Sequence, residues 1–385
     1  MTQRFLSVAG VGLGLATFLL ASCGARTVQL DGTPSDAGFS NPNSTPDAIG
    51  PGVSVVIEEQ ETAMKIAVDK TRVYWLSRLP AGYSAAEPAR YSRVRSCQKS
   101  DCPSTIVTYD SATFDATGAL PLQEFYELTV RDDNVYWARY TGGPRLSILT
   151  CPSVGCAGAP KIVVGDVDVT SIAVDATHVY WASRRDTAIL RRPLTGSSVP
   201  QAIALNENTP DEILVDATHV YWIANWGSAN ATIKRVSKQG GEPAVTLVTD
   251  QNQASSLALD DTFFYWANSY SVGTISRCPL SGCLGAPTVL VADQNRPSAL
   301  VTDGASIFWT SVTDESSHFQ TLAAVKRCRV DSCASATDTL AVQMFAWMGM
   351  SMALDASDVY WLAQGAEERA GNGFYPHASI YRHAK

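Results

Sequence analysis

Residues 171–182 are SIAVDATHVYWA, and variants of this stretch recur along the whole chain. Six copies place an aspartate six residues before a tryptophan, at Asp69/Trp75, Asp175/Trp181, Asp216/Trp222, Asp260/Trp266, Asp303/Trp309 and Asp355/Trp361. A seventh copy ends at Trp137 and has Arg131 at the aspartate position. The tryptophans follow one another at intervals of 41 to 62 residues, which suits a blade of four strands. The repeats therefore predict an all-β fold, a seven-bladed β-propeller.

Each copy has the pattern of two strands joined by a turn. Residues 172–174 and 179–181 are apolar, as expected of strands that are buried between neighbouring sheets. Asp175 lies between them, and an aspartate side chain can accept a hydrogen bond from the backbone N–H two residues further on. We therefore interpret the recurring aspartate as part of a turn and not as a set of catalytic acids.

The repeat resembles the YWTD repeats of the low-density lipoprotein receptor class B family. The resemblance rests on the pattern I-A-V-D-x-x-x-x-Y-W followed by I-x-R-x-x-L-x-G, and it is closest at residues 221–236, YWIANWGSANATIKRV. It covers nearly everything after residue 53 and implies a β-propeller. The chain departs from the family in two ways, because other residues replace the Thr-Asp of the motif and because seven repeats stand where the receptor modules have six. The resemblance therefore does not imply that this chain binds the partners of that family.

The two ends of the propeller are predicted to share one blade. The last repeat reaches residue 385 with only three strands, whereas residues 53–59 match the fourth strand of a repeat. We predict that residues 53–59 form the outer strand of the last blade and close the ring. The propeller then spans residues 53–385, and no blade is left incomplete.

The first 52 residues are predicted to lie outside the propeller. Residues 1–22 combine Arg4, an apolar run and the ending Leu-Ala-Ser before Cys23, a pattern that resembles a bacterial lipoprotein signal peptide. This resemblance implies that Cys23 is lipidated, that the protein is anchored to a membrane of the bacterial cell envelope, and that Gly24 directs it to the outer membrane. The alternative is an ordinary secretory signal. Residues 23–52 are rich in Gly, Pro, Ser and Asn and are predicted to be a flexible tether.

The eight remaining cysteines form four pairs with four residues between the partners. The pairs are Cys97/Cys102, Cys151/Cys156, Cys278/Cys283 and Cys328/Cys333, and two aligned repeats lack both positions together. Joint presence or absence indicates disulfide bonds, formed in an oxidising compartment. A zinc site is the rival interpretation, but the spacing is unusual for zinc and no histidine lies beside any pair.

Composition and motifs restrict the function without identifying it. The formal net charge is −8 and no basic run stands out, which argues against a nucleic-acid partner. No catalytic triad, zinc-protease motif, phosphate-binding loop or calcium loop is recognisable. We therefore expect no metal and no cofactor, and consider an enzyme less probable than a binding protein.

The candidate binding residues lie in loops that are predicted to meet on one face of the ring, which we call the upper face. They are Arg184, Arg185, Asn225, Trp226, Tyr270 and Trp347. Aromatic and arginine side chains in a polar rim are typical of interaction hot spots. We expect a non-catalytic module that binds a protein or a polysaccharide through this face. The alternative is an envelope enzyme, a lyase or hydrolase, that acts on a small molecule or glycan at the centre of the ring.

Overall fold

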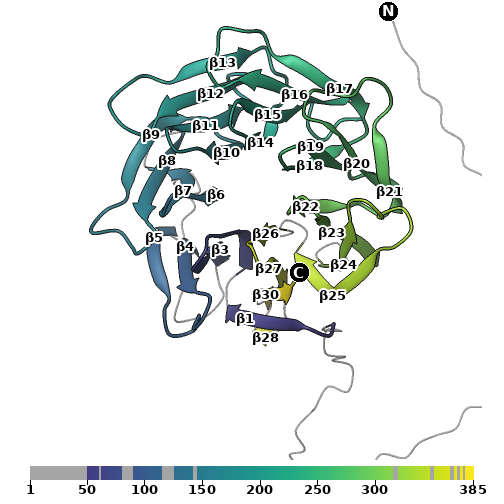
Figure 1. Ribbon diagram of the computed structural model, residues 1–385. Helices are drawn as coiled ribbons and strands as arrows, with labels where there is room; N and C mark the ends of the chain where they lie inside the picture. The colour runs from purple at the N-terminus through teal and green to yellow at the C-terminus, as the bar shows by residue number, and fades with distance from the viewer. Residues whose placement is uncertain are drawn as a thin grey trace, which may run out of the picture. The chain divides into compact units, whose positions relative to one another are not determined.

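The computed structural model describes residues 50–59, 62–79, 90–114, 125–141, 145–314, 320–346, 351–364, 368–370, 373–375 and 378–385. Their strands form seven blades of four antiparallel strands in a ring (Figure 1), so the predicted seven-bladed β-propeller is confirmed. These residues contain no helix, and hence none that is long and apolar enough to cross a membrane. The predicted signal peptide, Cys23 and residues 23–49 of the tether lie outside the described residues.

The blades follow the chain, and the strands of each blade run in order from the ring axis outward. The first has β2 (Thr62–Val68), β3 (Arg72–Leu79), β4 (Arg90–Gln98) and β5 (Val107–Phe114); the second has β6 (Phe125–Arg131), β7 (Asn134–Tyr140), β8 (Leu146–Pro152) and β9 (Lys161–Val167); the third has β10 (Ser171–Val174), β11 (His178–Ser183), β12 (Ala188–Pro193) and β13 (Gln201–Leu205). The fourth has β14 (Asp211–Val215), β15 (His219–Ala224), β16 (Ala231–Ser237) and β17 (Val245–Gln251); the fifth has β18 (Ala254–Leu259), β19 (Phe263–Asn268), β20 (Gly273–Pro279) and β21 (Thr288–Gln294); the sixth has β22 (Ser298–Thr302), β23 (Ser306–Asp314), β24 (Gln320–Arg329) and β25 (Asp338–Ala346).

The seventh blade closes the ring with strands from both ends of the propeller. It contains β26 (Met352–Leu354), β27 (Asp358–Gln364) and β30 (Ala378–Ala384), and its outer strand is β1 (Val53–Glu59). β1 pairs antiparallel with β30 in a register that places Val53 opposite His383. The predicted closure is thus confirmed. A small hairpin, β28 (Glu368–Ala370) with β29 (Gly373–Tyr375), lies between β27 and β30 in sequence.

The recurring aspartate forms the turn between the first two strands of its blade, as predicted. Asp175 Oδ1 accepts hydrogen bonds from the backbone N–H groups of Thr177 and His178, both at 2.8 Å, and Oδ2 accepts one from the Tyr180 hydroxyl at 2.9 Å. The same three bonds form at Asp69, Asp216, Asp260 and Asp355. One carboxylate therefore fixes both the turn and the tyrosine of each of these repeats.

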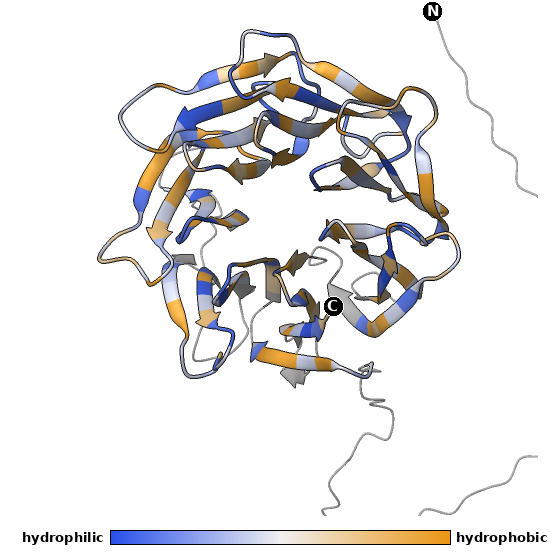
Figure 2. Ribbon diagram, viewed as in Figure 1, coloured by the Kyte–Doolittle hydropathy of each residue, from blue (hydrophilic) through white to orange (hydrophobic). Residues whose placement is uncertain are grey.

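The core is divided into seven apolar clusters, each between two adjacent blades. Each cluster contains the repeat tryptophan of one blade, and all seven of these tryptophans are fully buried. Figure 2 shows the matching bands of apolar and polar residues along the strands. Each tryptophan packs between two adjacent blades. The residue that marks a repeat in the sequence therefore also holds its blade against the adjacent one.

Most of the repeat tryptophans also donate an indole hydrogen bond to the outer strand region of the preceding blade. The acceptors are Asp110 for Trp137, Glu207 for Trp222, Gln251 for Trp266, Gln294 for Trp309 and Gln343 for Trp361, at 2.5–3.2 Å. Among the described residues, Trp75 Nε1 and Trp181 Nε1 are buried without a partner. For Trp181, the residue in the acceptor position is Val167. It follows Asp166, whose backbone has a positive φ, and the acceptors Glu207, Gln251 and Gln294 also follow a residue with a positive φ.

The variant Val167→Gln is expected to stabilise the protein by about 1 kcal/mol, because it supplies the missing acceptor for Trp181. The new amide can donate to the carbonyl of Gly165, as Gln251 and Gln294 do to the carbonyl two residues before them. Urea unfolding measures the difference. Val167→Met, which has similar size and no amide, is the matched control, and a glutamine variant less stable than the methionine variant would contradict the prediction.

Each of the four predicted cysteine pairs is bonded. The disulfides Cys97–Cys102, Cys151–Cys156, Cys278–Cys283 and Cys328–Cys333 have Cα–Cα separations of 4.7–5.3 Å. Each closes the turn from the third to the fourth strand of its blade, on the face that also carries the aspartate turns. We call this face the lower face.

Candidate functional site

Two of the predicted binding residues meet on the upper face, where blades three and four adjoin. The guanidinium carbon of Arg184 lies 5.0 Å from the ring centre of Trp226. Arg184 Nη2 is also 2.5 Å from Asp211 Oδ2, at the start of the innermost strand β14. Because Asp211 holds the guanidinium in place, the cation is oriented over the indole, and Trp226 keeps 39% of its surface exposed.

Asn225 supports this arrangement from within the loop. Its backbone has a positive φ of 55°, which asparagine tolerates better than most residues. Its side-chain oxygen accepts a hydrogen bond from Asn208 Nδ2 at 2.7 Å, and its backbone N–H donates to the Asn208 carbonyl, also at 2.7 Å. Asn225 therefore positions Trp226 rather than presenting a binding group of its own.

The remaining predicted residues are separate from this pair. Tyr270 is 50% exposed in the corresponding loop of the fifth blade, where Val272 is 66% exposed. The exposed Arg185 lies beside Arg184 in the chain, and its backbone N–H donates to Asp168 Oδ2 at 2.9 Å. Trp347 lies outside the described residues. The upper face of blades three to five thus presents one ordered Arg–Trp pair and a neighbouring aromatic loop.

A second group of charged residues lies at the ring axis and was not predicted from the sequence. Lys65 on β2 is 3.1 Å from Glu127 on β6, and both interact electrostatically with residues of β14 in the fourth blade. Side chains from the first, second and fourth blades can meet only across the axis, which the innermost strands surround (Figure 1). We call Lys65, Glu127, Asp211 and Glu212 the axial cluster.

Three members of the axial cluster occupy one position of the repeat, four residues before the turn residue. The set is Lys65, Glu127, Ser171, Glu212, Ser256, Ala299 and Ser351. Each of the three serines accepts a hydrogen bond from a backbone N–H of the next blade, at 3.0–3.2 Å. A comparison of the repeats at this position shows three charged residues among small ones, and this is the signal by which the sequence could have revealed the cluster.

Burial in the ring determines the charge of the axial cluster. Desolvation raises the pKa of Glu212 to about 8, although the Lys65 ammonium opposes the shift. Burial likewise raises the pKa of Glu127, while the Glu127 carboxylate holds the pKa of Lys65 above its ordinary value. The cluster therefore combines the Lys65 ammonium, the carboxyl groups of Glu127 and Asp211, whose pKa values burial raises, and a Glu212 side chain that is largely protonated at neutral pH. Such a set can donate or accept a proton.

The contribution of Glu212 to the free energy of unfolding is expected to fall as the pH rises from about 4.5 to about 8, because the folded chain holds a proton on Glu212 that the unfolded chain releases. We expect this fall to be about 1–2 kcal/mol, because access of water to the half-buried side chain reduces the effect of the pKa shift. Glu212→Gln should abolish it. Urea unfolding at pH 5 and pH 8 tests this, with the exposed Glu242→Gln as control. An unchanged slope in Glu212→Gln would refute it.

Within the part of the chain that the structure describes, no three His, Cys, Asp or Glu side chains come together as a metal site would require. The axial cluster has a lysine where a metal site would need a further ligand. The chemistry that its side chains can perform is proton transfer and the binding of charged groups.

Comparisons with known proteins agree with the fold. No family model matches the chain, and no curated protein matches its sequence. A solved streptogramin B lyase has 11% identity, covers 86% of this chain and 97% of its own, and has a TM-score of 0.54. A catalytically inactive virginiamycin B lyase from Staphylococcus aureus, solved with quinupristin, has 12% identity, the same coverage and a TM-score of 0.53. A nidogen/laminin complex matches 71% of this chain and 92% of its own, with 16% identity and a TM-score of 0.45. At these identities, the likeness to the two lyases shows a shared β-propeller fold.

Proposed function

We propose that this protein is a non-catalytic module of the bacterial cell envelope that binds a partner protein through the upper face of blades three to five. The observation that carries the proposal is the Arg184–Trp226 pair, fixed by Asp211 and left exposed. Tryptophan, tyrosine and arginine are the residues that contribute most often to binding hot spots. An arginine that is oriented before binding loses less side-chain entropy when a partner docks.

The proposal includes the location of the protein. Lipidation of Cys23 anchors it to the outer membrane, and residues 24–52 separate the anchor from the propeller. Membrane fractionation of the Cys23→Ser variant tests this part, because an unlipidated chain should leave the membrane fraction. A variant that stays in the outer-membrane fraction would refute the anchor without affecting the proposed binding face.

Crosslinking in intact cells, followed by purification of the propeller, tests the binding face. We expect the wild type to capture a partner that Trp226→Ala fails to capture. Leu284→Ala is the matched control, because Leu284 is an exposed apolar residue in a turn on the lower face. Loss of capture in both variants, or in neither, would contradict the proposal. If only a polysaccharide is retained by the wild type and lost by Trp226→Ala, the partner class is polysaccharide and not protein.

A second candidate function is an enzyme, a lyase or hydrolase, that acts on a small molecule or glycan at the ring axis. The axial cluster favours it, because the raised pKa of Glu212 is suited to a general acid that works near neutral pH. A screen of glycan and antibiotic substrates against the wild type and Glu212→Gln tests this. Turnover that disappears in Glu212→Gln while folding is retained would establish the enzyme.

A further inference from the structure

One position of the lower face recurs in all seven blades, directly after the third strand. Its backbone N–H donates to a carbonyl in the turn between the first two strands of the same blade, at 2.8–3.0 Å. We call it the junction position, because its side chain faces the aspartate turn of the preceding blade. It is occupied by Lys99, Ser153, Leu194, Lys238, Leu280, Val330 and Lys385.

Where the junction position is lysine, the ammonium group binds the turn aspartate of the preceding blade. Lys238 Nζ is 2.8 Å from Asp175 Oδ2 and 5.7 Å from the ring centre of Tyr180. Lys99 binds Asp355 in the same way and lies 5.1 Å from the ring centre of Tyr360. A carboxylate and a tyrosine ring together form a binding site for an alkylammonium ion, which we call a seat.

The lysines stabilise the ionised form of the turn aspartates. Burial opposes ionisation of Asp175 and Asp355, yet each carboxyl has a lowered pKa because of its lysine and of the backbone N–H groups of the turn. At the junction of the sixth and seventh blades, Lys385 Nζ is 2.9 Å from Asp303 Oδ2, and the pKa of Asp303 is also lowered, against the effect of burial, by that lysine and by turn N–H groups. The fold thus pairs a turn aspartate with a junction lysine three times, and at Asp175 and Asp355 the ammonium group also lies beside the turn tyrosine.

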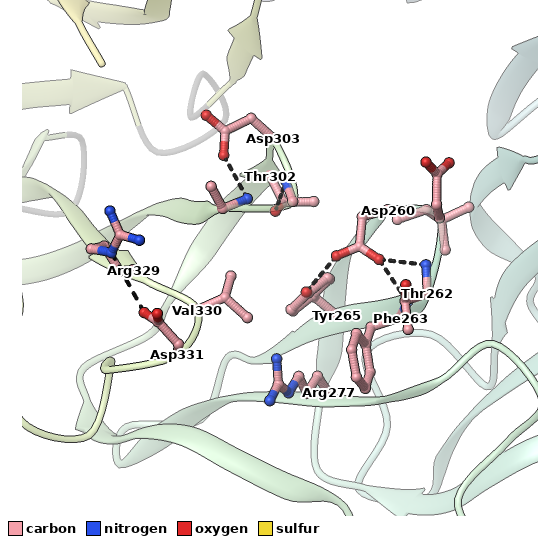
Figure 3. Close-up of a pocket in the computed structure, with 14 residues that line it drawn as sticks. Asp260, Thr262, Phe263, Tyr265, Arg277, Thr302, Asp303, Arg329, Val330 and Asp331 are labelled. Atoms are coloured by element: carbon pink, nitrogen blue, oxygen red, sulfur yellow. Dashed lines mark hydrogen bonds and ion pairs between the residues drawn. The ribbon is translucent and has the colours of Figure 1, made fainter.

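Three turn aspartates that bind a tyrosine face a junction residue other than lysine, and these are Asp69, Asp216 and Asp260. At Asp260, the junction of the fifth and sixth blades, the seat also opens into a pocket. Asp260 accepts the two turn N–H groups at 2.7 Å, and Tyr265 donates its hydroxyl hydrogen bond to Asp260 Oδ2 at 2.6 Å. The junction residue is Val330, whose side chain is too short to reach the carboxylate. A pocket of about 680 Å³ opens between them, lined by Leu259, Asp260, Tyr265 and Val330 (Figure 3).

The other charges of the pocket leave room for a cation. Asp331 pairs with Arg329 at 3.5 Å, and Asp303 is bound by Lys385. Arg277 lies against Phe263, with its guanidinium carbon 4.4 Å from the ring centre. Two carboxylates, Asp260 and Asp261, and one guanidinium group, that of Arg277, then remain among the residues that line the pocket. The lining therefore carries a net negative charge.

We propose that this pocket binds a primary alkylammonium group, the chemistry of a lysine side chain, in the place that Lys99, Lys238 and Lys385 occupy at other junctions. The ammonium group contacts Asp260 and the face of Tyr265, and the methylene chain lies along Leu259 and Val330. The site is on the lower face and is independent of the binding surface proposed for the upper face. A lysine of a partner protein and a free alkylamine present the same group.

Titration with Nα-acetyl-lysine methylamide, followed by NMR of the intact propeller, tests the site. We expect saturable binding with a dissociation constant on the order of millimolar, and at least about tenfold weaker binding by Asp260→Asn. The Nε-acetylated form of the probe, which has no charge, should not bind. Absence of saturable binding by the wild type at about 50 mM probe, which is well above the expected constant, would overturn the proposal.

The variant Val330→Lys gives a test that does not depend on weakening the turn. Its new lysine should occupy the seat, raise the melting temperature and abolish binding of the probe. Leu280→Lys, which lies beside Asp216 at the junction of the fourth and fifth blades, is the matched control and should leave probe binding at the pocket beside Val330 unchanged. Binding that survives in Val330→Lys would place the probe elsewhere and overturn the proposal.

Butylamine as a second probe separates the two sources of the alkylammonium group. Equal affinity indicates free amines, and tighter binding of the lysine probe indicates a protein side chain.

Discussion

Replacement of Ile57 by aspartate is expected to lower the free energy of unfolding by more than about 3 kcal/mol. Ile57 is 7% exposed in the outer strand of the seventh blade, within the apolar cluster between that blade and the first. An unpaired carboxylate there would have to be desolvated or would expel β1 from the ring. Urea unfolding measures the loss, and size-exclusion chromatography should show association through the uncovered edge of β30.

The same strand provides the control for this prediction. Val55→Asp changes a residue that is 41% exposed on β1, so its effect should stay within about 0.5 kcal/mol. Equal destabilisation by the two variants would show that any charge on β1 is harmful, and that burial of Ile57 is not what holds the ring closed.

Removal of all four disulfides, by replacement of the eight cysteines with alanine, is expected to lower the free energy of unfolding by up to about 8 kcal/mol. Loops this short contribute about 2 kcal/mol each in the chain-entropy model. The four disulfides lie in different blades, so their contributions should add. A loss of this size is comparable with the whole stability of many domains, and we expect unfolding to begin in low concentrations of urea.

Hydrogen exchange locates this effect, because the chain contains its own control. The turns at residues 99–106, 153–160, 280–287 and 330–337 should lose protection in the cysteine-free variant. The equivalent turns of the third and fourth blades, at residues 194–200 and 238–244, have no disulfide and should change little at urea concentrations where the ring stays closed. Uniform loss of protection across all blades would indicate that the disulfides stabilise the ring as a whole and not single turns.

The fold was predictable because its determinants recur. One aspartate and one tryptophan in each repeat mark a turn and a packing contact that every blade needs, so their spacing reveals the number of blades. The same logic identified β1 as a fourth strand without a blade of its own, and the cysteine pairs as turn disulfides. In each case the sequence was compared with itself, and the structure has the predicted pairing.

The candidate sites were less predictable, because they depend on contacts between blades. Trp226 and Arg184 were both recognised, but their pairing through Asp211 requires the twist and spacing of adjacent blades. Glu212 has a positive φ of 50° at a bulge of β14, and such a local shift in register cannot be inferred from a strand pattern. The open seat beside Val330 becomes visible only when the lysines at other junctions are seen to contact the preceding blade.

The pairing of β1 with β30 also has a consequence for the order in which the protein assembles. The two strands are separated by more than three hundred residues, so β1 stays unpaired until β30 has been synthesised. Pairings this distant in sequence form slowly. The six other blades can complete their local hairpins during synthesis, while the unpaired β1 is open to chaperones or to exchange with another copy of the chain. Pairing of β30 with β1 is then the event that closes the ring.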